Sequence, residues 1–320
     1  MDRKEHPSFE LSTSAARINC ANLRGVIASI PDVLDAKLVR GASAGDTPDL
    51  VIEIPHGATH TEDFVRLAAR LASPLPADLV DFFHVNTDAG APELALAIAE
   101  RFVAAEPVRS ALVLRCRIPR TFIDCNRRMD ASPEEFRAGK VTPGLMPWIT
   151  APADRALLRG LYDRYVAAVT MAMASLAPAG AILLLHTYAP RSVDVAVDEQ
   201  IVVNLRHAYR PEVEPTWPLR PELDVIARAV DGTDHAPHAV IDALRAALPG
   251  VTIGDSATYP LHPSTLAWHH VVEHPGRAVC IEVRRDLLAE PFEPFAQMTI
   301  GAAKVARLAP AFVAALRAWW

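Results

Sequence analysis

Two kinds of segment alternate along most of this chain. One is a short aliphatic run, and the other is a longer stretch with apolar residues at helical spacing. The aliphatic runs predict buried strands at Leu50–Ile54, Ser110–Arg115, Ala181–Leu185 and Ala278–Val283, and Thr121–Ile123 is also expected to be extended. The helical spacing predicts helices at Thr61–Leu71, Glu93–Ala104, Asp154–Leu176, Pro237–Leu248 and Phe295–Trp319.

This order of elements predicts an α/β fold with a mixed, mainly parallel sheet covered by helices on both faces, because doubly buried strands read as unbroken aliphatic runs. No stretch resembles a linker, so one domain over residues 1–320 is the simplest organisation. Residues 1–45 predict an irregular start, with a strand or hairpin around Val26–Ile30 and Lys37–Val39. Residues 193–233, rich in proline and charge, predict a long loop or small insertion near the site.

The composition narrows the class of partner. The chain has 320 residues, is 51% hydrophobic and carries a formal charge of -6, with acids and bases interspersed. Because the chain has no long basic blocks, we do not expect nucleic acids or anionic membranes as partners. No signal-type or membrane-spanning apolar segment is expected, and the oligomeric state stays open. Four cysteines without CxxC spacing predict reduced thiols and a soluble, cytoplasmic protein: Cys20, Cys116, Cys125 and Cys280.

Three ionisable residues lie in or directly after predicted strands, where active sites of open α/β sheets are found. His56 follows the first run, within PHGATH, and Gly57 beside it permits a close turn. His186 ends a fully aliphatic strand, and burying it requires a hydrogen-bond acceptor or a metal. Glu282 lies inside the strand of IEVRRDLL, where burial favours general-base work. The alternatives are structural histidines and an ion pair between Glu282 and a neighbouring arginine.

Two further segments carry polar clusters. FIDCNRR ends with Asn126 and Arg127, and a planar guanidinium beside an amide suits a substrate carboxylate, although a loop salt bridge between Arg127 and Asp124 explains it as well. Asp88 precedes a predicted helix, so it is either a metal ligand or a helix-start residue. Four histidines upstream of Glu282 either line the cleft or are solvated in loops: His262, His269, His270 and His274.

Taken in order, these segments resemble the N-formylglutamate amidohydrolase family, whose fold is similar to that of zinc carboxypeptidases and of the aspartoacylase and succinylglutamate desuccinylase group. The segments are PHGATH, NTDAGAPELA, RIPRTFIDCNR, VTPGLMP, LLLHTYAPRS and IEVRRDLL, from about Val51 to Leu288. IDCNR and IEVRRDLL are the most specific of them.

The resemblance implies that one zinc ion per chain binds His56 and His186, with Glu282 as the catalytic glutamate. It also implies that Arg127 and Asn126 clamp a substrate carboxylate and that Arg120 polarises the scissile carbonyl. Arg191, in LLLHTYAPRS, is expected to help bind the substrate.

The chain departs from the wider group at two places. Thr59 stands where carboxypeptidases and desuccinylases have a glutamate ligand, so Asp88 is the preferred third ligand, with Glu62, His60 and His84 as alternatives. The Gly-Thr-x-Asp-Gly and Arg-His-Tyr-Gly segments associated with formylglutamate deformylases are absent, and TYPLHPSTLAWHH occupies the place of the second.

The sequence thus predicts a zinc-dependent amidohydrolase that acts on a small N-acyl amino acid with a free carboxylate. Two other functions remain open. One is a non-catalytic protein that binds small carboxylates and keeps the fold, and the other is a peptidase or deiminase that uses the same site.

Overall fold

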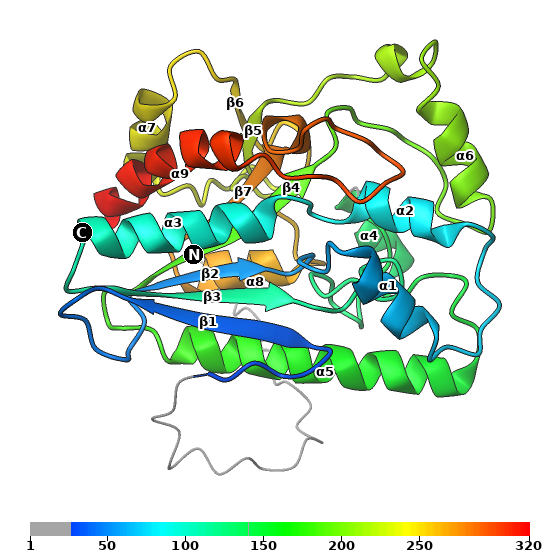
Figure 1. The fold of residues 1–320 in the computed structure, drawn as a ribbon, viewed down its shortest axis with the longest axis horizontal. Coiled ribbons are helices and arrows are strands. Elements are labelled where there is room, and N and C mark those ends of the chain that lie inside the picture. The colour runs from blue at the N-terminus through cyan, green and yellow to red at the C-terminus, as the bar shows by residue number, and fades with distance from the viewer. Residues whose placement is uncertain (1–26, 140) are drawn as a thin grey trace, which may run out of the picture.

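The computed structural model describes residues 27–320 except Lys140, and it contains a seven-stranded sheet with helices against both faces (Figure 1). The strands are β1 (Leu34–Arg40), β2 (Leu50–Ile54), β3 (Ser110–Cys116), β4 (Ala181–Tyr188), β5 (Leu223–Val225), β6 (Ile253–Asp255) and β7 (Ala278–Arg284). The α-helices are α1 (Thr61–Ala68), α2 (Leu79–Asn86), α3 (Ala91–Ala105), α4 (Pro133–Ala138), α5 (Pro152–Ala174), α6 (Ile201–Ala208), α7 (His238–Ala247), α8 (Leu266–Glu273) and α9 (Ala302–Leu316).

The strands lie in the order β1-β3-β2-β4-β7-β5-β6. The central strands β3, β2, β4 and β7 are parallel to one another, whereas β1 runs antiparallel to β3 and β5 antiparallel to β7. The sheet is therefore mixed and mainly parallel, as predicted. Because parallel strands end at the same edge, residues that follow β2, β3, β4 and β7 are brought together there.

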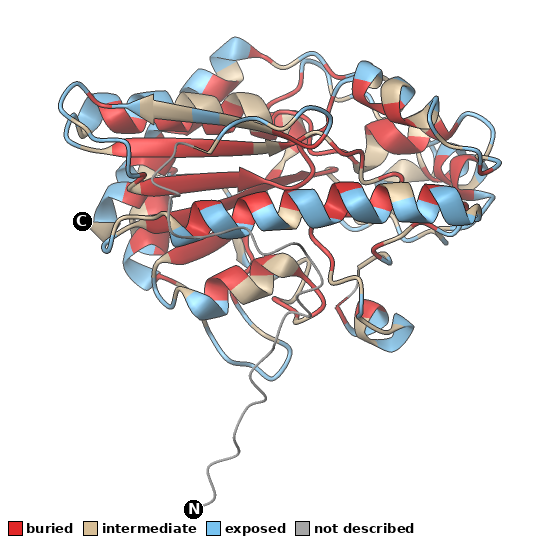
Figure 2. Ribbon diagram, turned by 90° about the horizontal axis from the view of Figure 1, so that it is seen from below, coloured by how far each residue is buried: buried red, intermediate tan, exposed pale blue. Residues whose placement is uncertain are grey.

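Strand β2 shows why the central strands are mainly apolar, and its one charged residue, Glu53, accepts a hydrogen bond from the Tyr165 hydroxyl. All its residues are buried. Leu50, Ile52 and Ile54 pack into the core formed with α3, α7 and α9, whereas Val51 packs into the core on the opposite face with α5. Both faces of the strand are covered, so no position favours a polar residue for contact with water. Figure 2 shows the central strands as buried and α5 with one exposed side.

Several predicted elements need correction. Thr121–Ile123 is a turn instead of a strand, with only Ile123 in a bridge to Leu145. Phe122 is fully buried, and its N–H donates to the carbonyl of Pro119 in a turn. Its apolar character therefore reflects burial and not pairing with another strand. The last helix begins at Ala302 instead of Phe295, after Gly301 as N-cap.

The predicted loop or insertion at residues 193–233 contains more structure than expected. Helix α6 lies within it, and β5 adds a strand to the sheet beside β7. A three-residue strand is too short to produce a readable pattern of apolar positions. In the predicted N-terminal start, Lys37–Val39 lies within β1, and Ile30 pairs with Leu34, whereas Val26 lies outside the described residues.

The described cysteines are free and buried, as predicted: Cys116, Cys125 and Cys280. Cys20 lies outside the described residues. Within residues 27–139 and 141–320, no helix combines the length and apolar character needed to cross a membrane.

Helix α8 places His270 inside the molecule, and neither of its ring nitrogens has a hydrogen-bond partner among the described residues. Burial lowers the pKa of His270, although nearby Glu53 and Glu273 act in the opposite direction. The folded protein therefore holds this imidazole neutral below the pH at which the unfolded chain protonates it.

We expect His270→Leu to reduce the pH dependence of folding stability. Since the folded pKa is lowered, the unfolded chain binds more protons, and stability falls as the pH drops below about 6.5. Removing the group should flatten this fall by up to about 1.4 kcal/mol per pH unit, as measured by urea unfolding at a series of pH values. An unchanged slope would contradict the burial of a neutral His270.

Candidate active site

The site begins at His56, directly after β2 and Pro55. Its imidazole is 3% exposed. A Cβ at Gly57 would lie 2.7 Å from Arg115 Cγ and 3.1 Å from the carbonyl oxygens of Ile54 and Cys116, so glycine avoids crowding at this turn. The two ring nitrogens of His56 have different partners, because Nδ1 lies 3.2 Å from Asp88 Oδ2 and Nε2 lies 2.8 Å from Asp124 Oδ1.

Asp88 lies in the turn between α2 and α3, held against the end of β2. Its N–H donates to the carbonyl of His56, and the Thr87 hydroxyl donates to the carbonyl of Ala58. The Asp88 carboxyl is 1% exposed. Burial by itself raises the pKa of this carboxyl, but His56 and His186 lower it, and the net pKa is below its ordinary value. The carboxylate is thus ionised beside two imidazoles.

His186 lies near the end of β4, and the parallel register places it directly opposite Glu282 on β7. Its Nδ1 is 3.1 Å from Asp88 Oδ2, and its ring centroid is 5.1 Å from that of His56. Burial by itself lowers the pKa of His186, but Cys280, Asp88 and Glu282 raise it well above its ordinary value. The surroundings therefore stabilise a positive charge here, whether of a proton or of a metal ion.

Glu282 lies next to this cluster and is partly buried, and its buried Oε2 atom has no hydrogen-bond partner among the described residues. Burial raises its pKa above the ordinary value, and Asp88 adds to this effect, while His186 and Arg220 oppose it. The ion pair with a neighbouring arginine is not formed, because Arg284 binds Asp286 and Arg285 binds Thr187 and Val85. A partly buried carboxylate with a raised pKa and a free oxygen suits a general base.

His56, Asp88 and His186 can together hold a metal ion. Their ligand atoms all lie within 4.8 Å of one another. Two imidazoles and one carboxylate match the donors that zinc prefers, and three protein ligands leave a position open for water, as in catalytic sites. Both imidazoles direct Nδ1 toward the shared carboxylate, so the donor set fits a divalent cation.

The alternative ligands lie elsewhere. His60 forms the N-cap of α1 and contacts Gln297, His84 contacts the Thr61 hydroxyl, and Glu62 is exposed. None of these residues belongs to the group that could bind a metal within the described part of the chain.

Asp124, which the sequence suggested only as a salt-bridge partner of Arg127, also contacts His56 and Arg120. It is fully buried, and its carboxylate binds His56 Nε2 at 2.8 Å, Arg120 Nη2 at 2.9 Å and Arg127 Nη2 at 3.3 Å. Burial by itself raises its pKa, but Arg127, His56 and Arg120 lower it well below the ordinary value. A carboxylate that binds the outer nitrogen of a ligating histidine fixes the ring and raises its basicity. The expected salt bridge to Arg127 is present and is only part of this network.

The two arginines of the FIDCNRR region differ in availability. The Arg120 side chain is 19% exposed, and its Nε has no partner among the described residues. The Arg127 side chain is 5% exposed, and it donates to the carbonyls of Thr142 and Asn126 besides contacting Asp124. The Asn126 side-chain oxygen accepts from the N–H of Ala267.

Arg191, predicted to bind the substrate together with Asn126 and Arg127, makes its contacts with the segment around Trp217. Its Nε contacts Glu214 at 3.0 Å, and its Nη1 donates to the carbonyl of Trp217 at 2.7 Å. By contrast, Arg220, which sequence reasoning missed, contributes positive charge near Glu282. Arg220 Nη2 donates to the Tyr259 hydroxyl at 2.9 Å, and its guanidinium lies over the Tyr188 ring. A lone arginine in a proline-rich segment gave no sequence signal for this position.

The histidines upstream of Glu282 have mixed environments. His262 contacts Ser264, His269 lies against Trp268, and His274 contacts the carbonyl of His270. His270 faces the core on the α8 side of the sheet, where Glu53 is its electrostatic neighbour. Their place in the cleft stays a prediction.

The paired histidines and buried carboxylates lie at the carboxyl edge of the sheet, where ligands of open α/β folds bind, and they offer donors that suit a catalytic metal ion. The sequence profile of N-formylglutamate amidohydrolases matches residues 48–289. The chain therefore belongs to the N-formylglutamate amidohydrolase family and is a hydrolase, as its sequence predicted.

The chain is also similar to solved structures, of which the first supports the fold. The N-formylglutamate amidohydrolase from Ralstonia eutropha JMP134 is 18% identical, with a TM-score of 0.52, and the match covers 88% of this chain and 96% of that one. A gene product of Agrobacterium tumefaciens is 17% identical, with a TM-score of 0.48 and coverage of 89% and 94%. A metallo-carboxypeptidase from Burkholderia cenocepacia is 14% identical, with a TM-score of 0.37 and coverage of 88% and 59%. A comparison with curated proteins finds no significant match.

Asp124→Asn should weaken zinc binding by about 10- to 100-fold, because the amide cannot supply the charge that orients and polarises His56. Competition with a chromophoric chelator measures this affinity. Asp163→Asn is the matched control, since Asp163 lies on α5 and pairs only with Arg159 at the surface. Equal affinities of the two variants would refute the role of Asp124.

Proposed function

We propose that this hydrolase cleaves the amide bond of a small N-acyl amino acid, of the N-formyl type, that carries a free carboxylate. The grouping of His56, Asp88 and His186 beside an unpaired Glu282 supports this proposal most strongly. One zinc ion bound by these three side chains would lower the pKa of water to about 7 and polarise a carbonyl group.

Glu282 is the proposed general base. It lies on the strand beside His186, and its raised pKa lets the carboxylate accept a proton from the attacking water near neutral pH. The same carboxyl then returns the proton to the nitrogen of the leaving amine. No other hydrogen bond competes for its Oε2 among the described residues.

Arg120 is proposed to stabilise the negative charge that develops on the carbonyl oxygen. Asp124 holds one end of its guanidinium at 2.9 Å, the side chain is 19% exposed, and its buried Nε has no partner among the described residues. A fixed cation directed at the position of developing charge acts without reorganisation during the reaction.

Arg127 and Asn126 are proposed to bind the substrate carboxylate. The three contacts of Arg127 leave N–H groups on both terminal nitrogens, and the Asn126 amide nitrogen is an additional donor. Arg191, which contacts Glu214 and the Trp217 carbonyl, stays a predicted substrate-binding residue.

The buried free thiols favour a reducing compartment, for which we propose the cytoplasm.

Glu282→Gln should lower turnover by at least about 100-fold, because the amide cannot accept the proton from water, while zinc binding is retained. Turnover is measured as amine released from N-formyl amino acids, together with the metal content. Glu62→Gln is the control, since the exposed Glu62 lies outside the cluster, and this variant should keep full activity. Retained turnover in Glu282→Gln would exclude Glu282 as the base.

Metal content separates the enzyme from a non-catalytic binding protein with the same fold. The purified protein should contain close to one zinc ion per chain and lose activity with a chelator, with recovery when zinc is restored. A content below about a tenth of a metal ion per chain, without chelation, would favour the binding protein.

A panel of N-formyl, N-acetyl, N-succinyl and formimino amino acids, together with dipeptides, tests the substrate class. Preferential release of amine from N-formyl compounds is expected. Preference for dipeptides or formimino compounds would indicate the peptidase or deiminase instead.

A further inference from the structure

A segment beyond β4 forms a lobe that the proposed reaction does not use. We call residues 193–217 the excursion. Its two ends are joined by backbone contacts, because Arg191 pairs with Leu219, the N–H of Ser192 donates to Pro218, and the N–H of Arg220 donates to Pro190. The excursion therefore leaves the sheet at the carboxyl edge and returns to the same place.

The excursion has a fixed position. Within it, α6 is held to α2 by Arg206, which contacts Asp81 at 2.7 Å and Asp78 at 3.0 Å. Its C-terminal end is held by Arg191, which donates to the carbonyl of Trp217. Binding sites that are formed before the ligand arrives lose less free energy on ordering.

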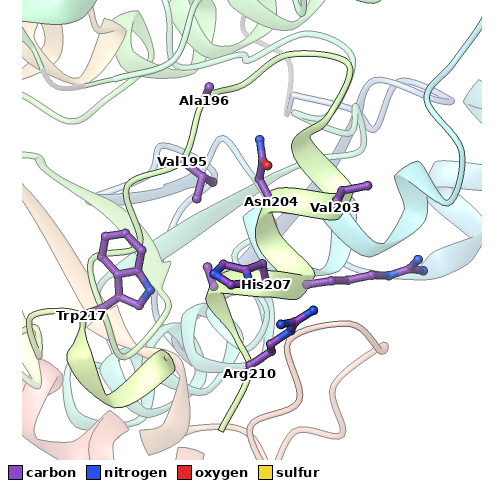
Figure 3. A pocket seen from close by; sticks show the side chains of 9 residues that line it. Val195, Ala196, Val203, Asn204, His207, Arg210 and Trp217 are labelled. Carbon is purple, nitrogen blue, oxygen red and sulfur yellow. The ribbon is translucent and has the colours of Figure 1, made fainter. Parts of the chain in front are cut away.

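A pocket of about 680 Å³ lies within the excursion, a volume typical of small-molecule sites. Figure 3 shows the Trp217 ring on one side, Asn204 and His207 of α6 across from it, and Arg210 at the lower rim. The lining residues are Val195, Ala196, Val203, Asn204, Arg206, His207, Ala208, Arg210 and Trp217.

The charges of the lining favour an anion. No acidic residue contributes to the lining, whereas Arg206, His207 and Arg210 all do. The aspartates on α2 bind Arg206, but the exposed side chain of Arg210 has no acidic partner among the described residues. An arginine without a carboxylate partner is suited to bind one from a ligand.

The remaining lining groups favour a flat apolar body. Trp217 contributes an indole ring whose buried N–H has no acceptor among the described residues. Val195, Ala196 and Ala208 add apolar surface, and Val203 at the edge is 62% exposed. Aromatic rings beside a few polar donors bind planar ligands that carry an acceptor group.

We propose that this pocket is a second binding site, separate from the metal cluster, for a small organic anion with a planar apolar body. The carboxylate of the ligand binds Arg210, and its ring lies against Trp217, between Val195 and Ala196 on one side and α6 on the other. This site does not depend on the hydrolytic mechanism, so its absence would leave the proposed reaction untouched.

Isothermal titration calorimetry of the full-length, zinc-loaded protein with naphthoate tests the site. One naphthoate should bind per chain with a dissociation constant below about 1 mM, and neutral naphthamide should bind at least about 10-fold more weakly, because it lacks the charge. No binding of naphthoate in the millimolar range, or equal binding of naphthamide, would overturn the proposal.

Two matched variants locate the site. Arg210→Gln should weaken naphthoate binding at least about 10-fold, whereas Arg164→Gln, which removes an exposed arginine of α5, should change it less than about 2-fold. Thermal unfolding checks that both variants are folded. Equal affinity in Arg210→Gln and Arg164→Gln would place the binding elsewhere, including at the metal cluster, and refute the assignment.

Trp217→Ala provides an independent variant, because it removes the ring against which naphthoate lies. Naphthoate binding should weaken by a measurable factor of about 3 or more. Binding at full strength in this variant, with the fold intact by thermal unfolding, would overturn the assignment of the ligand to this pocket.

Discussion

A buried carboxylate shared by two imidazoles is the interaction on which the site depends. Asp88 Oδ2 lies 3.2 Å from His56 and 3.1 Å from His186, with almost no contact with water. An isolated ionised carboxylate in such a place would be strongly unfavourable, so positive charge must be supplied beside it. Protons on the histidines or a divalent cation can supply this charge. The pKa directions of Asp88 and His186 both express this requirement.

The sheet makes this convergence possible. His56 follows β2, His186 lies in β4 and Glu282 lies in β7, and these three strands are adjacent and parallel. Asp88 is brought to the same edge by the turn between α2 and α3, and Arg285 fixes this region by joining Val85 to Thr187 at the end of β4. A rigid arrangement of this kind holds reacting groups without large losses of conformational freedom during the reaction.

A second layer of charges surrounds the cluster. Asp124 accepts a hydrogen bond from Arg120 and contacts His56 Nε2 and Arg127 Nη2, so one carboxylate orients a candidate metal ligand and two arginines proposed to contact the substrate. Arg220, whose guanidinium contacts the Tyr259 hydroxyl and lies over the Tyr188 ring, adds positive charge near Glu282. Beyond this layer the excursion forms a separate lobe with its own cationic pocket, and the hairpin-like contacts at its base connect it to the end of β4.

The sequence by itself predicted the central strands, most long helices and the family, and it singled out His56, His186 and Glu282, whose roles are proposals. These features depend on local patterns, since a doubly buried strand is mainly aliphatic and a polar residue within it or at its end is conspicuous. The short strands β5 and β6, the turn at Phe122 and the helix within residues 193–233 were not predicted, because tertiary contacts stabilise them. Only the tertiary structure decided that Asp124 binds His56 and that Arg191 binds Glu214 and Trp217. Hydrogen-bond partners far apart in the chain are set by how the strands and loops pack, and spacing along the sequence carries no record of them.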